Sequence, residues 1–211
     1  TGNRGLCGSY NTNVIANTMS FKQKLEAEGK EVSLYVIGKK AQGYYRFIEQ
    51  PMYKSGLNPE DKITFELAAE FSEELKQAFL KGEFHEVYIS YTKVISSSSQ
   101  RPEIFRLLPI QMEEEKQDTG SVVGTELDYI FEPNPHEFFH YLLPLYQKVR
   151  LFSCFLESSY SEQFARRVAM KNASDASKEM IRELTISYNR ARQAKITNEI
   201  AEIVGGAAAL E

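Results

Sequence analysis

The sequence predicts a mixed α/β protein with one exceptionally long C-terminal helix, and two observations support this. Residues 1–132 alternate between helical and strand-like patterns, with glycine or proline at many of the segment ends. Leu145–Val204 then runs for sixty residues without a glycine or proline. We therefore expect two domains, an α/β head at residues 1–132 and a long helix at residues 133–211.

The first elements of the head follow a polar capping signal. Asn11 or Thr12 can cap a helix that stops at Gly29. Val32–Ile37 is a short, largely apolar run that ends at Gly38. The pattern predicts a helix followed by a buried strand.

A second helix and three more strands complete the predicted head. Pro59 suits the first turn of a helix that ends at Gly82. The apolar side of this helix is formed by Ile63, Leu67, Phe71, Leu75, Ala78 and Phe79. Further strands are expected at Phe84–Ile95, Ile104–Gln111 and Leu127–Phe131, with an acidic loop at Glu113–Gly124. This alternation indicates a three-layer, Rossmann-like head.

The long helix needs a partner. Its sixty residues span roughly 90 Å, whereas a compact domain formed by residues 1–144 is only about 35–40 Å across. Helices are stabilised mainly by packing an apolar face. Such faces consist of Val149, Phe152, Leu156 and Tyr160, then Met180, Leu184 and Ala191, and finally Ile196, Ile200, Ile203 and Ala207. We expect another helix to cover them.

Composition limits the possible functions. The formal net charge of −4 disfavours general nucleic-acid binding. Cys7 and Cys154 form neither a CxxC motif nor a disulfide framework, which fits a reducing compartment. No apolar run reaches the roughly 18 residues needed to cross a bilayer, and no signal-peptide pattern is present. We expect no direct bilayer insertion, so that any membrane association comes through partners.

Two features near the N-terminus resemble a binding or catalytic site. Gly2, Gly5 and Gly8 suggest a phosphate-binding loop, but their spacing is not GxGxxG. Cys7 lies near a predicted helix start, where its pKa could fall, but no histidine base is near it in the sequence. A packed turn is the better interpretation of both.

The segment from His136 to His140 matches the HExxH motif of zinc hydrolases, with Glu137 in the place of the base. A catalytic zinc site needs a third protein ligand, and the only other histidine is His85 in a predicted strand. Pro144 is expected to disturb the turn that carries the motif. We therefore expect an aromatic helix buried under the head, and no catalytic residue, cofactor or metal.

Two regions resemble the gamma subunit of F-type ATP synthases. The first is the segment NRGLCGSYNTN at residues 3–13. The second covers the C-terminal helix, with AMKNASDA at residues 169–176, YNRARQAKITNEI at 188–200 and EIVGGAAA at 202–209. The resemblance covers nearly the whole chain, and the tail motif is highly specific.

This resemblance implies a rotor subunit without catalytic residues. In the family, an N-terminal and the C-terminal helix form an antiparallel coiled coil that turns inside a hexamer of alpha and beta subunits. The head contacts the epsilon subunit and the c-ring, and proton flow drives the rotation. The implied beta-subunit contacts are Arg192, Gln193 and Thr197; the c-ring and epsilon contacts are Tyr129, Phe131 and Glu132; the bearing tip comprises Ile200, Ile203, Val204 and Ala207.

The resemblance also implies a missing N-terminal helix and first strand, because Thr1 aligns with the end of that strand. We expect a fragment whose missing helix would cover the apolar stripe. Cys7 and Cys154 cannot be the paired cysteines of redox-regulated chloroplast-type subunits, which favours a bacterial protein at the cytoplasmic face of the plasma membrane. A non-rotary coiled-coil adaptor with an α/β head explains the same architecture but not the tail motifs.

Overall fold

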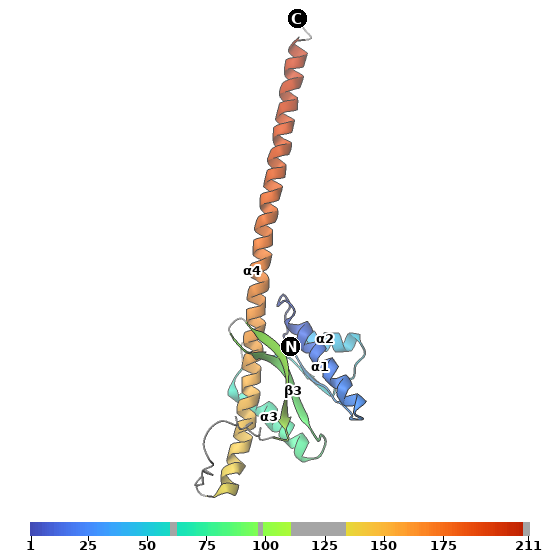
Figure 1. Ribbon diagram of the computed structural model, residues 1–211, viewed down its shortest axis with the longest axis vertical. Helices are drawn as coiled ribbons and strands as arrows, with labels where there is room; N and C mark the ends of the chain where they lie inside the picture. The colour runs from blue at the N-terminus through green and yellow to red at the C-terminus, as the bar shows by residue number, and fades with distance from the viewer. Residues whose placement is uncertain (60–62, 97–98, 111–133, 209–211) are drawn as a thin grey trace, which may run out of the picture. The chain divides into compact units, whose positions relative to one another are not determined.

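The computed structural model describes residues 1–59, 63–96, 99–110 and 134–208 (Figure 1). Their elements are α1 (Tyr10–Ala27), β1 (Tyr35–Ile37), α2 (Lys39–Phe47), β2 (Lys54–Gly56), α3 (Phe65–Leu80), β3 (Val87–Val94), β4 (Gln100–Leu108) and α4 (Pro135–Ala208). The chain divides into two compact units, Thr1–Arg166 and Arg167–Glu211. The prediction of a mixed α/β fold with a long C-terminal helix is confirmed.

Helix α1 matches its predicted extent but not its predicted cap. Ser9 is the N-cap residue, rather than Asn11 or Thr12. At the other end Gly29 has a φ of 80°, a left-handed conformation that glycine adopts without strain. The amide of Lys30 there donates to the carbonyl of Leu25 at 3.0 Å. The helix therefore ends in a Schellman motif, as its glycine predicts.

Strands β1 and β2 are parallel and are joined through α2. Tyr35 pairs with Lys54 in this sheet, and β1 is shorter than the predicted strand Val32–Ile37. Neither α2 nor β2 was predicted. Their core is a small cluster of Ile15, Leu34, Val36, Ala41 and Tyr45.

Strands β3 and β4 form an antiparallel hairpin that lies between α1 and the first half of α4 (Figure 1). Tyr88 faces α1, where its ring lies 4.9 Å from that of Phe21. Phe105 faces the other way, and the guanidinium of Arg150 on α4 lies 4.4 Å from its ring centre. Because side chains alternate along a strand, one hairpin holds both helices. β3 lies inside its predicted range, whereas β4 begins four residues before the predicted Ile104.

Helix α3 begins later than its proline suggests. Its N-cap is Thr64, whose hydroxyl accepts a hydrogen bond from the amide of Leu67 at 3.3 Å. Ile63 therefore precedes the helix, and Pro59 does not start it. The predicted apolar side is present farther along, where Leu75 and Phe79 pack against a cluster on the hairpin formed by Val87, Leu107 and Leu108.

Helix α4 contains 74 residues and includes Pro144 in its interior. The expectation that Pro144 disturbs this turn is wrong, because the helix is assigned continuously through it. The expected burial of the aromatic segment is wrong as well: Phe138 is 38% exposed and Tyr141 is 78% exposed. The predicted acidic loop Glu113–Gly124 and strand Leu127–Phe131 lie outside the described residues.

Replacing Gly38 with alanine is expected to destabilise the protein by about 2–4 kcal/mol. Gly38 has a φ of 104°, and an added Cβ would collide with the carbonyl oxygen of Thr1. Gly43, inside α2, is the matched control, because its Cβ would meet nothing within 4 Å. Gly43→Ala should be neutral or stabilising by up to about 1 kcal/mol. Urea unfolding measures both, and equal effects would contradict the prediction.

Candidate functional site

One face of α4 is buried within the first unit. Its residues lie within about 100° of one another around the helix, and Gln147, Leu151, Cys154, Ser161 and Glu162 are each at most 4% exposed. The amide of Gln147 donates to the carbonyl of Ser72 on α3 at 3.0 Å. This buried face is mostly small or polar, so its sequence alone does not mark it as a packing surface.

The apolar stripe predicted from the sequence lies on a different face of the same helix. Val149 is 44% exposed, and Leu156 and Tyr160 are each 45% exposed. Phe152 of this stripe contacts α3, where its ring meets the edge of the Phe65 ring at 5.8 Å. The first unit therefore packs on the small, polar face of α4 and leaves much of the apolar stripe exposed.

In the second unit α4 exposes large apolar side chains. Met180, Ile181, Leu184, Tyr188, Ile200 and Ile203 have exposed fractions between 56% and 72%. Charged neighbours make only weak ion pairs along the helix, such as Lys195 to Glu199 at 3.8 Å. A helix with this surface is not stabilised by its own contacts, because stability comes mainly from burying an apolar face.

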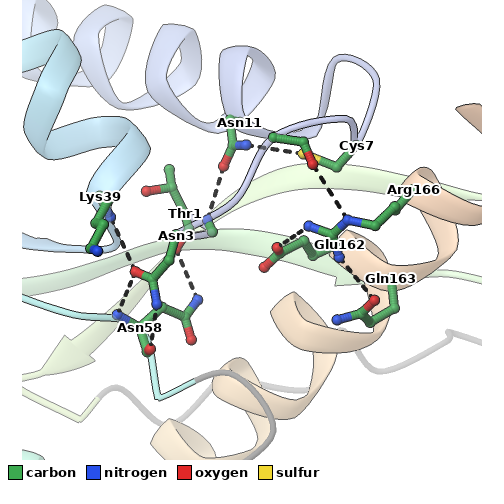
Figure 2. Close-up of polar contacts among 11 residues, drawn as sticks. Thr1, Asn3, Cys7, Asn11, Lys39, Asn58, Glu162, Gln163 and Arg166 are labelled. Atoms are coloured by element: carbon green, nitrogen blue, oxygen red, sulfur yellow. Dashed lines mark hydrogen bonds and ion pairs between the residues drawn. The ribbon is translucent and has the colours of Figure 1, made fainter.

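A loop at residues 1–9 connects the start of α1 to the rest of the head (Figure 2). The side-chain oxygen of Asn3 accepts hydrogen bonds from the amides of Lys39 at 3.2 Å and Asn58 at 3.1 Å, and its amide donates to the carbonyl of Asn58 at 2.8 Å. Asn11 accepts from the amide of Gly2 at 2.9 Å. The three glycines of this loop thus belong to a hydrogen-bonded turn.

Arg166 joins this loop to α4 (Figure 2). Its guanidinium donates to the carboxylate of Glu162 at 2.6 Å, to the side chain of Gln163 at 2.8 Å and to the carbonyl of Gly5 at 3.4 Å. The Glu162 side chain is only 5% exposed. This pair was not predicted from the sequence, although a glutamate and an arginine four residues apart on a helix are a recognisable signal for an ion pair.

The cysteine on α4 is not a reactive site. Burial raises the pKa of the Cys154 thiol to about 12, so the thiol remains protonated at neutral pH. Tyr91 on β3 is buried beside it, and burial likewise raises the pKa of its hydroxyl. Cys7 is also buried, and both cysteines are free. These groups form part of the interior rather than a catalytic or redox centre.

The HExxH segment lies in the first turns of α4 with His136, Glu137 and His140 exposed. His85, the third histidine, is exposed just before β3. Across residues 1–59, 63–96, 99–110 and 134–208, no group of three histidine, cysteine or acidic side chains is placed to hold a metal ion. The zinc interpretation therefore has no support in the described geometry.

The predicted contact residues on the second unit lie on exposed helix surface. Arg192 and Gln193 are exposed, and the Thr197 hydroxyl donates to the carbonyl of Gln193 at 2.9 Å. At the predicted bearing tip, Ile200, Ile203 and Val204 are exposed, whereas the side chain of Ala207 is outside the described part. The predicted contacts Tyr129, Phe131 and Glu132 also lie outside the described residues.

Comparison with known proteins gives consistent matches. The family described as ATP synthase matches residues 1–210. The ATP synthase gamma chain of Leptospira biflexa serovar Patoc is 40% identical over 208 residues, which cover 99% of this chain and 71% of the relative. That of Symbiobacterium thermophilum is 42% identical over 213 residues, covering 100% and 70%. The chain thus spans about seven-tenths of these bacterial relatives.

Solved structures show the same fold. A chain in the mitochondrial ATP synthase of Euglena gracilis, solved with OSCP, F1 and c-ring, matches with a TM-score of 0.67 and 22% identity, covering 100% of this chain and 70% of its own. A chain of the central stalk and c-ring of the Tetrahymena thermophila enzyme matches at 0.58 and 23%, covering 82% and 73%. At sequence identities of 22% and 23%, the similarity shows that the fold is shared.

No helix within the described part of the chain is both long and apolar enough to cross a membrane.

Replacing Cys154 with alanine is expected to make stability fall less steeply between about pH 9 and pH 12. The unfolded thiol titrates near 9.0 and the folded one near 12, so in this range the unfolded chain releases a proton that the folded chain keeps. The free energy of unfolding therefore falls by at most about 1.4 kcal/mol per pH unit through Cys154, and the alanine variant lacks this contribution. Denaturant unfolding at several alkaline pH values measures the slope. Identical slopes for both proteins would refute the assignment.

Proposed function

Because the chain belongs to the ATP synthase gamma chain family, a non-catalytic central-stalk subunit, we propose that it transmits torque between a membrane c-ring and a hexamer of alpha and beta subunits. The observation that carries this proposal is the surface of α4. The helix runs for 74 residues and exposes large apolar side chains along much of its length. Such a surface needs partners on several sides.

The first partner is a second helix. The stripe at Val149, Leu156 and Tyr160, and the residues around Leu184, repeat at coiled-coil spacings and remain exposed. We propose that α4 forms half of an antiparallel coiled coil whose other half is the gamma N-terminal helix. In functional terms the chain then comprises a head at residues 1–132, of three-layer Rossmann-like type, and a shaft at residues 133–211.

The second set of partners surrounds the end of the shaft. Gln193 and Thr197 lie one helical turn apart, and Arg192 adjoins them. A guanidinium and an amide can exchange hydrogen bonds between successive acidic loops as the shaft turns. We propose that these three residues contact the beta subunits. The exposed aliphatic tip at Ile200, Ile203 and Val204, with Ala207, then turns in the bearing of the hexamer.

The remaining partners are at the opposite end. We propose that Tyr129, Phe131 and Glu132 meet the epsilon subunit and the c-ring, because exposed aromatics beside a carboxylate suit an interface. The relatives are bacterial, and the proposed location is the cytoplasmic face of the plasma membrane. The chain would be held there through the c-ring, without inserting into the bilayer or binding nucleic acid.

A chimera tests this function. The 211-residue segment would replace the matching part of the Leptospira biflexa gamma chain, and the product would be assembled with that enzyme's other subunits. We expect the complex to couple ATP hydrolysis to proton pumping. A coiled-coil adaptor would instead fail to co-purify with alpha and beta subunits, and an assembled complex that hydrolyses ATP without pumping would refute torque transmission by this segment.

Replacing Arg192 with alanine in this chimera is expected to lower the ATP synthesis rate about 10- to 150-fold, the effect of losing one charged hydrogen bond of about 1.5–3 kcal/mol. Lys178→Ala is the matched control, since Lys178 is also an exposed basic residue but lies 14 residues, about 21 Å, earlier along the helix. Synthesis in inverted vesicles measures both variants. Equal losses, or none at Arg192, would contradict the proposed contact.

A further inference from the structure

Arg166 occupies a special position on α4. It is the last residue of the first compact unit, and its side chain bonds to the loop of residues 1–9. The helical side chains that follow it, through Gly206, are exposed or half-exposed. The proposed function requires torque to travel along α4. For torque that comes from the C-terminal end of the helix, the contacts of Arg166 and Glu162 are the first contacts with the head.

The Glu162 carboxylate is closely surrounded. Arg166 lies 2.6 Å from its Oε1 atom, and Gly2 also lies against it, because a Cβ added to Gly2 would be only 2.5 Å from the same oxygen. Glu162 is 4% exposed as a residue. A charge buried to this degree is tolerated only when it is paired and hydrogen-bonded. Arg166 satisfies this requirement and also reaches the carbonyl of Gly5, so that the pair connects α4 to the loop (Figure 2).

The loop is in turn attached to the rest of the head. Asn3 bonds the backbone at Lys39, the first residue of α2, and at Asn58. Tyr10, at the start of α1, is buried and bonds to Ser158 on the same face of α4. Force that reaches the loop through Arg166 is thus distributed to α1, to α2 and to the segment after β2.

Polar and apolar contacts resist rotation differently. Apolar contacts are non-directional, so they resist a small rotation of α4 against the head less sharply than directed hydrogen bonds do. Charge-assisted hydrogen bonds depend on direction and distance. We propose that Arg166 and Glu162 are positioning residues that fix the rotational angle of α4 in the head and pass torque from the helix into the loop of residues 1–9. This proposal rests on the rotor function proposed above.

The test uses the assembled chimeric enzyme with a probe attached to the head. Arg166→Ala removes the pair and the bond to Gly5, Arg166→Lys keeps the charge, and Arg167→Ala is the matched control because Arg167 is exposed one residue farther on. The readouts are the angular spread of the probe at each catalytic dwell and the protons pumped per ATP hydrolysed. A merely structural role would change stability but not these two quantities in folded complexes.

We expect Arg166→Ala to widen the angular variance about twofold and to lower pumping per ATP by a similar factor, with ATP hydrolysis retained. Arg166→Lys should recover most of both, and Arg167→Ala should match the unmodified chain. If Arg166→Ala does not assemble, the near-isosteric Glu162→Gln carries the test. Unchanged spread in assembled Arg166→Ala or Glu162→Gln complexes overturns the proposal. An unmodified chimera that does not rotate would instead refute the rotor function itself.

Discussion

The burial of one narrow face of α4 is the constraint on which the rest of the structure depends. Between Gln147 and Glu162 this face packs against α3, the β3–β4 hairpin and the start of α1. Its residues are small or polar, so close approach and directed hydrogen bonds determine the fit rather than bulk alone. Because the head covers this face, the apolar stripe that includes Val149 and Leu156 stays exposed on another face, where we propose that a second helix packs.

A helix with one buried and one exposed face suits a subunit that turns without catalysing. The interior groups that might have been reactive are held neutral: burial raises the pKa of Cys154 and Tyr91, which keeps the thiol and the hydroxyl protonated. The polar side chains of the head instead make hydrogen bonds that hold its elements at defined angles, such as those of Asn3 and Arg166. A rotor needs stiffness at these joints more than it needs reactive side chains.

Local rules predicted some elements well and others poorly. Gly29 ended α1 where a left-handed cap was expected, and the enrichment of Phe84–Ile95 in tyrosine, valine and isoleucine located β3. By contrast, α2 was missed because Gly43 and polar residues weaken its helical pattern, and β2 was missed because three residues carry little periodic signal. Pro144 was misjudged: a proline removes one backbone hydrogen bond, and a helix of 74 residues continues through that loss.

The sequence by itself determined that the chain has a long C-terminal helix, an α/β head and the tail motifs of one family, since these depend on periodicity and on the absence of breakers along sixty residues. Only the tertiary structure decided which face of α4 is buried, because the small residues around Cys154 and Ser161 carry no hydrophobic signal. It also brought Glu162 and Arg166 against a loop more than 150 positions earlier in the chain, near Gly2 and Gly5. Such a junction depends on how distant segments fold together, and no local pattern encodes it.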